Sequence, residues 1–524
     1  MPSISNSLLS QSQQLTQAER DLNTRVNRLN RRLEGESAED LSQPEQYDKL
    51  SISNEALIKS QERTNTYEVP ELASPITHTT DKGNTFTFST IKKSDGSNQL
   101  VLEFKDQFGE QKRFNISEDT VIREDEHGNI SFGDIRDGGS DGNDIVIDFL
   151  TGKSESFDAK GGNDFVLSLG NAMTASADEV FEKDGETYMV NRDSKGNVVS
   201  STRITQGKTN ISTGEGDDTV FLVGQAGENF TVDTGDGDDS VTGRQINNSE
   251  NSRGLYANIS TGAGDDTVSL DGMNNGRIDT GAGDDVVTVE NLYGSKENNG
   301  VDEGVISTGS GNDKVSVTNN YYGYIETGAG KDTVTVDKLL GDAEKDTSKS
   351  GTIDSGEGDD TIIVNTMEKG TIEAGGGSDT MSFDSVKDST IKAGSGNDSL
   401  SFETVKGSYI ETGSGQNSVT VRGEMEDVTF NAGGGDVKFM LTNMATSKNV
   451  KFLNMSKASA NSLMPFINGS QMAIVLKGGD YGINITVNGD ASEQANTDTY
   501  KALMDLLQQS AESKESSRSI DTIV

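Results

Sequence analysis

Aspartate recurs at regular intervals through residues 136–440, each time two residues after a glycine. The full unit is Thr-Gly-x-Gly-Asp-Asp-x-Val-x-Val or a close variant. Its last acidic residue, called the marker below, stays Asp while the residue before it varies. In the compact copies successive markers are 19 residues apart, and longer intervals contain inserted residues. The markers are Asp144, Asp164, Asp218, Asp239, Asp266, Asp285, Asp313, Asp332, Asp360, Asp379 and Asp398.

A pair of glycines stands four and two residues before most markers. Glycine adopts backbone dihedrals that are closed to other residues, so the pair permits a tight turn whose carbonyls face one point. Stacked turns of this kind would surround an oxygen-lined site that suits Ca²⁺, which takes about six to eight oxygen ligands, better than Mg²⁺. The candidate glycines are Gly214, Gly216, Gly235, Gly237, Gly262, Gly264, Gly281, Gly283, Gly309, Gly311, Gly328, Gly330, Gly356, Gly358, Gly375, Gly377, Gly394 and Gly396.

A metal-free alternative exists for any single copy, because Asp and Asn side chains commonly bond the amides of their own turn. A stacked column of unpaired carboxylates would repel strongly, however, and bound Ca²⁺ turns that repulsion into attraction. The recurrence of Asp at every marker therefore favours several calcium ions, in one column between successive coils, over a metal-free turn.

Apolar residues at fixed distances from the marker predict two strands per coil. An isoleucine or its equivalent stands seven residues before the marker, as Ile278 does. Two further apolar residues stand two and four residues after it, as Val287 and Val289 do, and this alternation gives a strand with one inward face. Single coils cannot bury these side chains but stacked coils can. The expected fold is all-β, a right-handed parallel β-solenoid.

The segment Thr213-Gly214-Glu215-Gly216-Asp217-Asp218-Thr219-Val220 resembles the calcium-binding nonapeptide of RTX (repeats-in-toxin, hemolysin-type) β-roll proteins, with Thr in place of the first Gly. The resemblance covers roughly residues 137–437. Typical RTX β-rolls carry the motif on both turns of a coil, whereas here one turn carries it, which implies a single calcium column. The spacing is similar to that of RTX-derived repeats in bacterial ice-binding adhesins, where a Thr stands between the two glycines. Glu215, Asp236 and Ala263 stand there in this chain, so no ice-binding array is expected.

The composition limits the partners. The 524 residues carry a net charge of −41, include no Cys, and are 31% hydrophobic. Such an acidic chain repels nucleic acid and anionic membranes and attracts cations. No apolar run reaches the roughly 18 residues of a membrane span, and Met1–Gln17 lacks the basic and apolar regions of a cleaved signal peptide. The oligomeric state is left open.

Five regions are expected along the chain. Leucines seven residues apart predict a helical leader at 1–35, and a polar linker follows at 36–79. Alternating apolar residues predict a small β-meander at 80–135. The calcium-binding solenoid is expected at 136–440, with a hairpin insertion at about 171–205. A C-terminal cap with strands and a final helix, followed by a candidate secretion signal, is expected at 441–524.

The last six residues, Ser519-Ile520-Asp521-Thr522-Ile523-Val524, resemble the C-terminal signal of type I secreted RTX proteins. Repeats that fold only on binding external calcium would stay threadable in a low-calcium cytosol. The Ser- and Gln-rich leader also suits a type III route, although type I is favoured. These features predict a bacterial protein that is extracellular or on the cell surface.

Catalysis has few residues to use, since the chain contains only two histidines, His78 and His127, and no Cys. The favoured function is therefore a structural or adhesive one without enzyme activity. A polysaccharide-modifying enzyme on a β-helix scaffold and an exported bacterial effector are the alternatives. The candidate ligand-binding group is Tyr321, Tyr322 and Tyr324, which could stack on a sugar of a polysaccharide or a host surface, or form a plain surface ladder.

Overall fold

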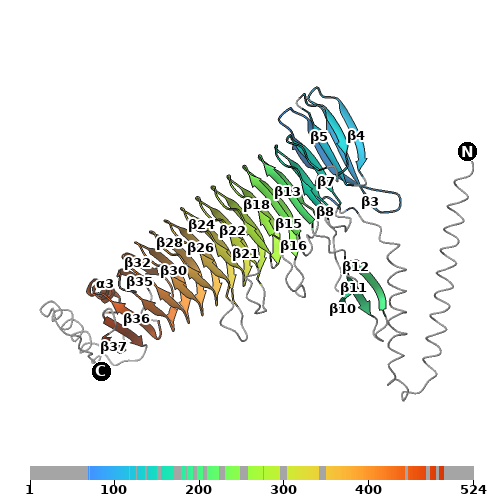
Figure 1. Ribbon diagram of the computed structural model, residues 1–524. Coiled ribbons are helices and arrows are strands. Elements are labelled where there is room, and N and C mark those ends of the chain that lie inside the picture. Colours follow the sequence, from blue (N-terminus) through green and yellow to red (C-terminus); the bar gives the residue numbers. More distant parts are fainter. Residues whose placement is uncertain are drawn as a thin grey trace, which may run out of the picture. The chain divides into compact units, whose positions relative to one another are not determined.

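The protein is described by a computed structural model whose described residues form two compact units. One contains Tyr67–Ala175 and Thr205–Val524, and it holds the right-handed parallel β-solenoid that the sequence predicts (Figure 1). The leader, most of the linker, the final predicted helix and the secretion tail lie outside the described residues. The described residues are 69, 71–116, 119–125, 127–135, 138–149, 155–169, 179–183, 186–192, 198–204, 209–223, 230–247, 258–274, 276–294, 304–341, 350–442, 447–467, 473–478 and 483–488.

Two long sheets face each other along the solenoid, and each regular coil gives one strand to each sheet. The long-strand sheet follows the glycine turns and contains β5 (Thr120–Glu124), β6 (Ile130–Gly133), β7 (Asp144–Asp148), β9 (Phe165–Ser168), β14 (Thr219–Leu222), β16 (Ser240–Asn247), β18 (Thr267–Asn274), β20 (Val286–Tyr293), β22 (Lys314–Tyr321), β24 (Thr333–Leu340), β26 (Thr361–Glu368), β28 (Thr380–Lys387), β30 (Ser399–Lys406), β32 (Gln416–Val421), β33 (Met425–Glu426) and β35 (Asp436–Leu441). From β7 onward its neighbouring strands are parallel and in register from coil to coil, so Val287 lies between Val268 and Val315.

The short-strand sheet precedes the glycine turns. Its strands are β8 (Glu155–Asp158), β13 (Thr209–Glu215), β15 (Phe230–Asp236), β17 (Asn258–Ser260), β19 (Arg277–Asp279), β21 (Val305–Ser307), β23 (Tyr324–Glu326), β25 (Thr352–Asp354), β27 (Thr371–Glu373), β29 (Thr390–Lys392), β31 (Tyr409–Glu411), β34 (Thr429–Asn431), β36 (Val450–Met455), β38 (Ile483–Asn488) and β37 (Ala473–Gly478). The inserted residues of the longer intervals, near 244–254, 292–302 and 339–349, fall largely outside the described residues, each between a long strand and the next short one.

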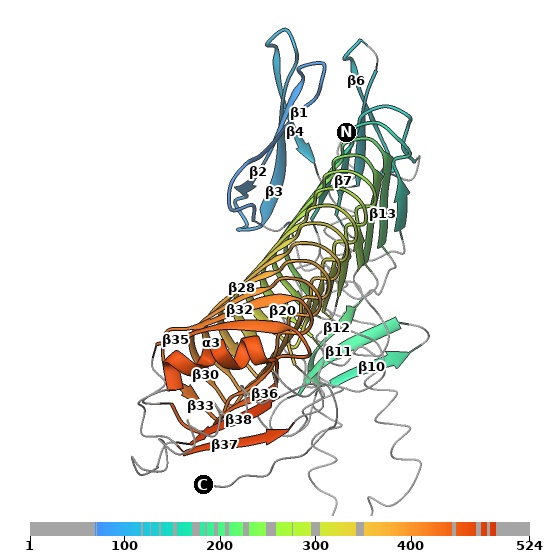
Figure 2. The same ribbon diagram turned by 90° about the vertical axis from the view of Figure 1, so that its left-hand side faces the viewer.

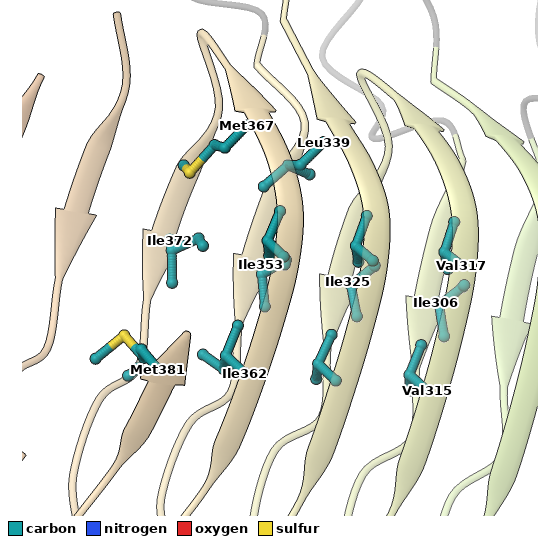
Figure 3. Packing of buried hydrophobic residues seen from close by; sticks show 14 of the residues in the cluster. Ile306, Val315, Val317, Ile325, Leu339, Ile353, Ile362, Met367, Ile372 and Met381 are labelled. Atoms are coloured by element: carbon teal, nitrogen blue, oxygen red, sulfur yellow. The ribbon is translucent and has the colours of Figure 1, made fainter. Parts of the chain in front are cut away.

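Apolar ladders fill the space between the sheets (Figure 3). Ile325, Ile353 and Ile372 form the ladder seven residues before the markers, and they are fully buried, as predicted. A further buried column stands seven residues after the markers, and strict alternation does not predict it. Two outward residues in succession break the alternation in β20, β22, β24, β26, β28 and β30, and the residue that follows them points inward. This column contains Met273, Leu292, Leu339, Met367, Val386 and Val405.

The first coils are apolar on both faces. In β7, Val146 faces the solenoid core, whereas Ile145 and Ile147 belong to a second core. That second core lies against an antiparallel sheet of β1 (Ile76–Thr79), β2 (Thr85–Lys92), β3 (Asn98–Lys105) and β4 (Gln111–Ile116), where the ring of Phe88 stacks on that of Phe165 at 5.5 Å. From β16 onward most outward positions next to the turn carry Ser or Thr. The sheet β1–β4 therefore covers the outer face of the first coils (Figure 2).

The predicted meander region is divided between two sheets. Strands β2 to β4 join β1 in the four-stranded sheet, whereas β5 and β6 extend the long-strand sheet. Because β5 pairs antiparallel with β7, Arg123 lies opposite Asp144 at the position that a preceding coil would otherwise occupy.

Among the described residues, the C-terminal end is capped by helix α3 (Lys457–Ile467) and by the antiparallel pair β37 and β38 (Figure 2). The strands expected in the C-terminal cap match β37 and β38, but α3 was not expected. Ser456 begins the helix, since its hydroxyl accepts the Ser459 N–H at 3.0 Å. The Ser459 hydroxyl accepts the N–H of Val437 at 2.7 Å, and Leu463 is buried in the solenoid core. The helix thus closes the core and caps an amide of the edge strand β35.

The second unit contains an antiparallel sheet of three strands, β10 (Glu179–Lys183), β11 (Glu186–Arg192) and β12 (Val198–Ile204). These strands fall within the range 171–205 that was predicted as an inserted hairpin, with one strand more than a hairpin has.

Candidate metal centre

The glycine turns stack so closely that their backbones bond one another. In the turn Gly262-Ala263-Gly264 the Ala263 N–H donates to the Gly235 carbonyl of the preceding coil at 3.1 Å, and the Ala263 carbonyl accepts the Gly237 N–H at 2.7 Å. Both glycines have positive φ, +99° for Gly262 and +141° for Gly264. A side chain on either glycine would strike the preceding turn, so the glycines are required by both the dihedral angle and the close approach.

Replacing Gly311 by Ala is expected to lower the thermal midpoint of the solenoid measurably. The added Cβ would lie 1.7 Å from the Gly283 carbonyl oxygen, and the φ of +138° is strained for Ala, which alone costs about 1–3 kcal/mol. Ser310→Ala in the same turn is the matched control, because the Ser310 side chain is exposed. Thermal unfolding followed by circular dichroism compares the two, and equal midpoints would show that the close approach is not limiting.

The marker aspartates form a buried column whose first carboxylate oxygen has a structural task. Each marker after Asp144 turns one oxygen, Oδ1, toward the preceding coil and accepts the backbone N–H of the marker there. Asp285 thus accepts the N–H of Asp266 at 2.9 Å, and Asp313 accepts that of Asp285 at 2.9 Å. The same bond, at 2.7–3.0 Å, joins every successive pair from Asp144 to Asp398.

The second carboxylate oxygen of the column makes no hydrogen bond of normal geometry, although the Thr or Ser hydroxyl of the same turn lies near enough to limit the rise that burial causes in the pKa of the markers from Asp218 to Asp360. Oδ2 is buried and accepts no hydrogen bond in Asp164, Asp218, Asp239, Asp266, Asp285, Asp313, Asp332, Asp360, Asp379 and Asp398. In the described turns from Gly216 to Gly396 the carbonyl of the second glycine also accepts no hydrogen bond. That carbonyl points along the solenoid axis, since the Gly216 oxygen lies 2.0 Å from where a Cβ of Gly237 would be. A buried, unpaired carboxylate oxygen is costly unless a proton or a cation compensates it.

These oxygens fit a hard cation. A calcium ion accepts carboxylate and carbonyl oxygens in an irregular shell, so Oδ2 and the second-glycine carbonyl are the groups that would hold it. Among the described residues, no three His, Cys, Asp or Glu side chains converge as a metal-binding group. Any ion in the column would therefore take most of its ligands from the backbone, with few carboxylates per ion.

Burial raises the pKa of the markers. Removal of the carboxylates from water is the largest cause, and nearby aspartates add to it in most of them. The pKa of Asp218, Asp266 and Asp285 rises to about 6, and that of Asp239 and Asp379 rises to about 7. Below the pKa of each marker a proton can therefore occupy the unpaired oxygen, whereas above that pKa the same oxygen requires a cation.

The residues that precede the markers form a second, exposed column that bonds in the opposite direction. The Asp284 Oδ1 accepts the N–H of Asn312 in the following coil at 2.7 Å, and the Asp265 Oδ1 accepts the N–H of Asp284 at 2.8 Å. Asn and Ser can supply the same acceptor, as Asn397 does for the N–H of Gln416 at 2.9 Å. This tolerance explains why the preceding position varies in the sequence while the marker does not.

A buried threonine column, which was not among the predicted site residues, lines the other side of the markers. The hydroxyl of Thr308 donates to the carbonyl of Thr327 at 3.2 Å, and the hydroxyl of Thr327 donates to the carbonyl of Ser355 at 3.1 Å. The Thr of the repeat therefore ties consecutive turns together. Its recurrence five residues before the marker was the available signal.

The three tyrosines do not form one cluster. Tyr321 ends β22 and its ring stacks on that of Tyr293 in the preceding coil at 4.9 Å. Tyr324 lies in β23 of the other sheet, and its hydroxyl donates to Asp354 Oδ2 at 3.2 Å. Tyr322 lies in the connection between β22 and β23 and has a φ of +66°. The ring of Tyr293 covers one face of the Tyr321 ring. Sugar binding by the three tyrosines stays a prediction.

The fold and the turns define a parallel β-solenoid with a buried column of aspartates. No protein-family model and no curated protein matches the chain. Among solved structures the chain is similar to a hyperactive, Ca²⁺-dependent, beta-helical antifreeze protein from an Antarctic bacterium, with 18% sequence identity and a TM-score of 0.41 over 68% of this chain and 92% of that chain. A likeness of this degree assigns no function. In the part of the chain that the structure describes, no helix is long and apolar enough to cross a membrane.

Proposed function

We propose that the chain is a calcium-binding solenoid of the RTX-like kind, in which one column of calcium ions lies beside the marker aspartates. The observation that carries the proposal is the buried, unpaired Oδ2, which recurs in every turn from Asp164 to Asp398. A metal-free turn needs only Oδ1, which accepts the backbone amide. It does not explain why a second oxygen is buried without a hydrogen bond at each step.

Charge supports calcium over a metal-free column. At neutral pH the markers with pKa values of about 6 would be largely ionised at about one strand spacing from each other, roughly 4.8 Å. The net charge of −41 supplies no compensation elsewhere in the chain. Divalent ions between the turns remove both the repulsion and the unmet coordination of Oδ2.

The proposed role is that of a calcium-stiffened structural or adhesive element, exported by a bacterium and folded outside the cell, without enzyme activity. The repeated residues support it, because turn glycines, buried threonines, core residues and markers all serve to build the coil. Export by a type I route, and adhesion to a polysaccharide or a host surface, rest on the sequence features alone.

The test is far-UV circular dichroism of the full chain, titrated from EDTA to about 10 mM Ca²⁺, a range that brackets extracellular calcium modules. The proposal expects a marked gain of β signal with Ca²⁺, and little gain with equimolar Mg²⁺. A complete β spectrum in EDTA at neutral pH, unchanged by calcium, would overturn the proposed metal column.

A further inference from the structure

The first marker differs from those inside the column, because the protein supplies its counter-charge. Asp144 is fully buried, yet both of its carboxylate oxygens have partners. The N–H of Ser140 donates to Oδ2 at 2.7 Å, and the Ser140 hydroxyl donates to Oδ1 at 3.1 Å. The Arg123 guanidinium, on the antiparallel strand β5, lies 4.0 Å from Oδ1 and also donates to the Gly138 carbonyl. A fixed cation thus lies beside the first carboxylate.

The position after the last marker is also self-satisfied. Asn417 replaces Asp, and its Oδ1 continues the ladder by accepting the N–H of Asp398 at 2.8 Å. Its Nδ2 donates to the carbonyl of Thr412 at 2.9 Å, and more weakly to that of Gly413 at 3.4 Å. The amide nitrogen therefore makes, toward carbonyl oxygens of its own turn, the contact that a marker Oδ2 cannot make without a proton or a cation.

We propose that Arg123 and Asn417 close the calcium column at its two ends, so that calcium is confined to the turns of Asp164 to Asp398. The inference rests on the proposed function and deepens it, since it states which turns take the ion and which are built to do without it. Arg123 places a cation beside Asp144, and Asn417 places an N–H donor where an interior marker has an unpaired oxygen. Closure of this kind gives a finite column with no ion exposed at either end.

The test is the number of calcium ions held by the full chain, counted by native mass spectrometry at saturating Ca²⁺. Asn417→Asp is expected to hold one calcium ion more than the wild type, and to unfold at lower urea concentration in EDTA. Asn397→Asp is the matched control, because it adds the same charge at an exposed position of the adjoining turn. The control is expected to keep the wild-type count.

The reciprocal change, Asp398→Asn, keeps the oxygen that accepts the Asp379 N–H and replaces the unpaired one with a donor. It is expected to hold at least one calcium ion fewer and to unfold at higher urea concentration in EDTA. This variant decides the question even where Asn417→Asp does not fold.

Removal of the positive charge beside Asp144 provides a third, independent test of the closure. Arg123→Gln is expected to hold one calcium ion more than the wild type and to lower stability in EDTA, because Asp144 then lacks the cation that takes the place of an ion there. Calcium counts that do not change in Asn417→Asp and Asp398→Asn, or a count in Arg123→Gln that does not rise, would overturn the closure. A wild-type chain that binds no calcium would instead overturn the proposed function itself.

Discussion

Acidification of the calcium-free protein is expected to stabilise the solenoid. Burial raises the pKa of five marker aspartates, Asp218, Asp239, Asp266, Asp285 and Asp379, from 3.8 to about 6 or 7, so over this interval the folded chain holds protons that the unfolded chain has released. The contribution of these protons to the free energy of unfolding is complete below about pH 4. It falls as the pH rises through about 6 to 7, by about 1.4 kcal/mol per pH unit for each proton bound only by the folded state. Several markers act together, so the effect is large.

Urea unfolding in EDTA at pH values between about 4.5 and 7.5 measures this slope. At saturating Ca²⁺ the dependence should reverse, because protons then compete with the ion for the same oxygens. General repulsion within an acidic chain would also weaken on acidification, but about 0.5 M NaCl screens exposed charges and leaves buried ones largely unaffected. A slope that disappears in salt would therefore assign the effect to the exposed acids and not to the column.

The regular part of the fold could be predicted from the sequence, because each coil repeats the same physical demands. Apolar residues at fixed distances from the marker fix the register, and their burial at Ile325, Val334 and Val336 follows the prediction. The two glycines give the turn directly, since both φ and the approach of the next coil exclude a side chain. The motif also indicates the marker, and burial separates it from the acidic residue that precedes it.

Other features depend on contacts that spacing does not express. The column at Leu292 and Leu339 requires a local break of the alternation, which appears only when the strand bends toward the next sheet. The sequence pattern did not predict helix α3, because its serines, such as Ser459, bond backbone amides of the edge strand β35 as well as groups of the helix itself. The pairing of Arg123 with Asp144 depends on β5 running antiparallel to the coils, and no repeat specifies that direction.

Two adjacent aspartates of one turn should respond very differently to removal. Asp285→Ala takes away the buried Oδ1 that accepts the Asp266 N–H at 2.9 Å, together with the Oδ2 proposed to bind the ion. The loss of the buried acceptor alone costs about 1–3 kcal/mol, and the lost ion adds to it in calcium. Asp284→Ala removes an exposed acceptor of the Asn312 N–H, for which water can substitute, so a cost below about 1 kcal/mol is expected.

Urea unfolding at saturating Ca²⁺, with calcium counting on the same samples, compares the two variants directly. Both remove one carboxylate from the same turn, so the change in net charge and the loss of a side-chain acceptor are matched. A lower calcium count and a large loss of stability confined to Asp285→Ala would place the ions on the buried column. Similar losses in both variants would instead locate binding on the exposed column, where Asp217, Asp238 and Asp265 also lie. The hydrogen bonds favour the first outcome. The exposed carboxylates accept backbone N–H groups and are also solvated, whereas each buried carboxylate keeps one oxygen that accepts no hydrogen bond.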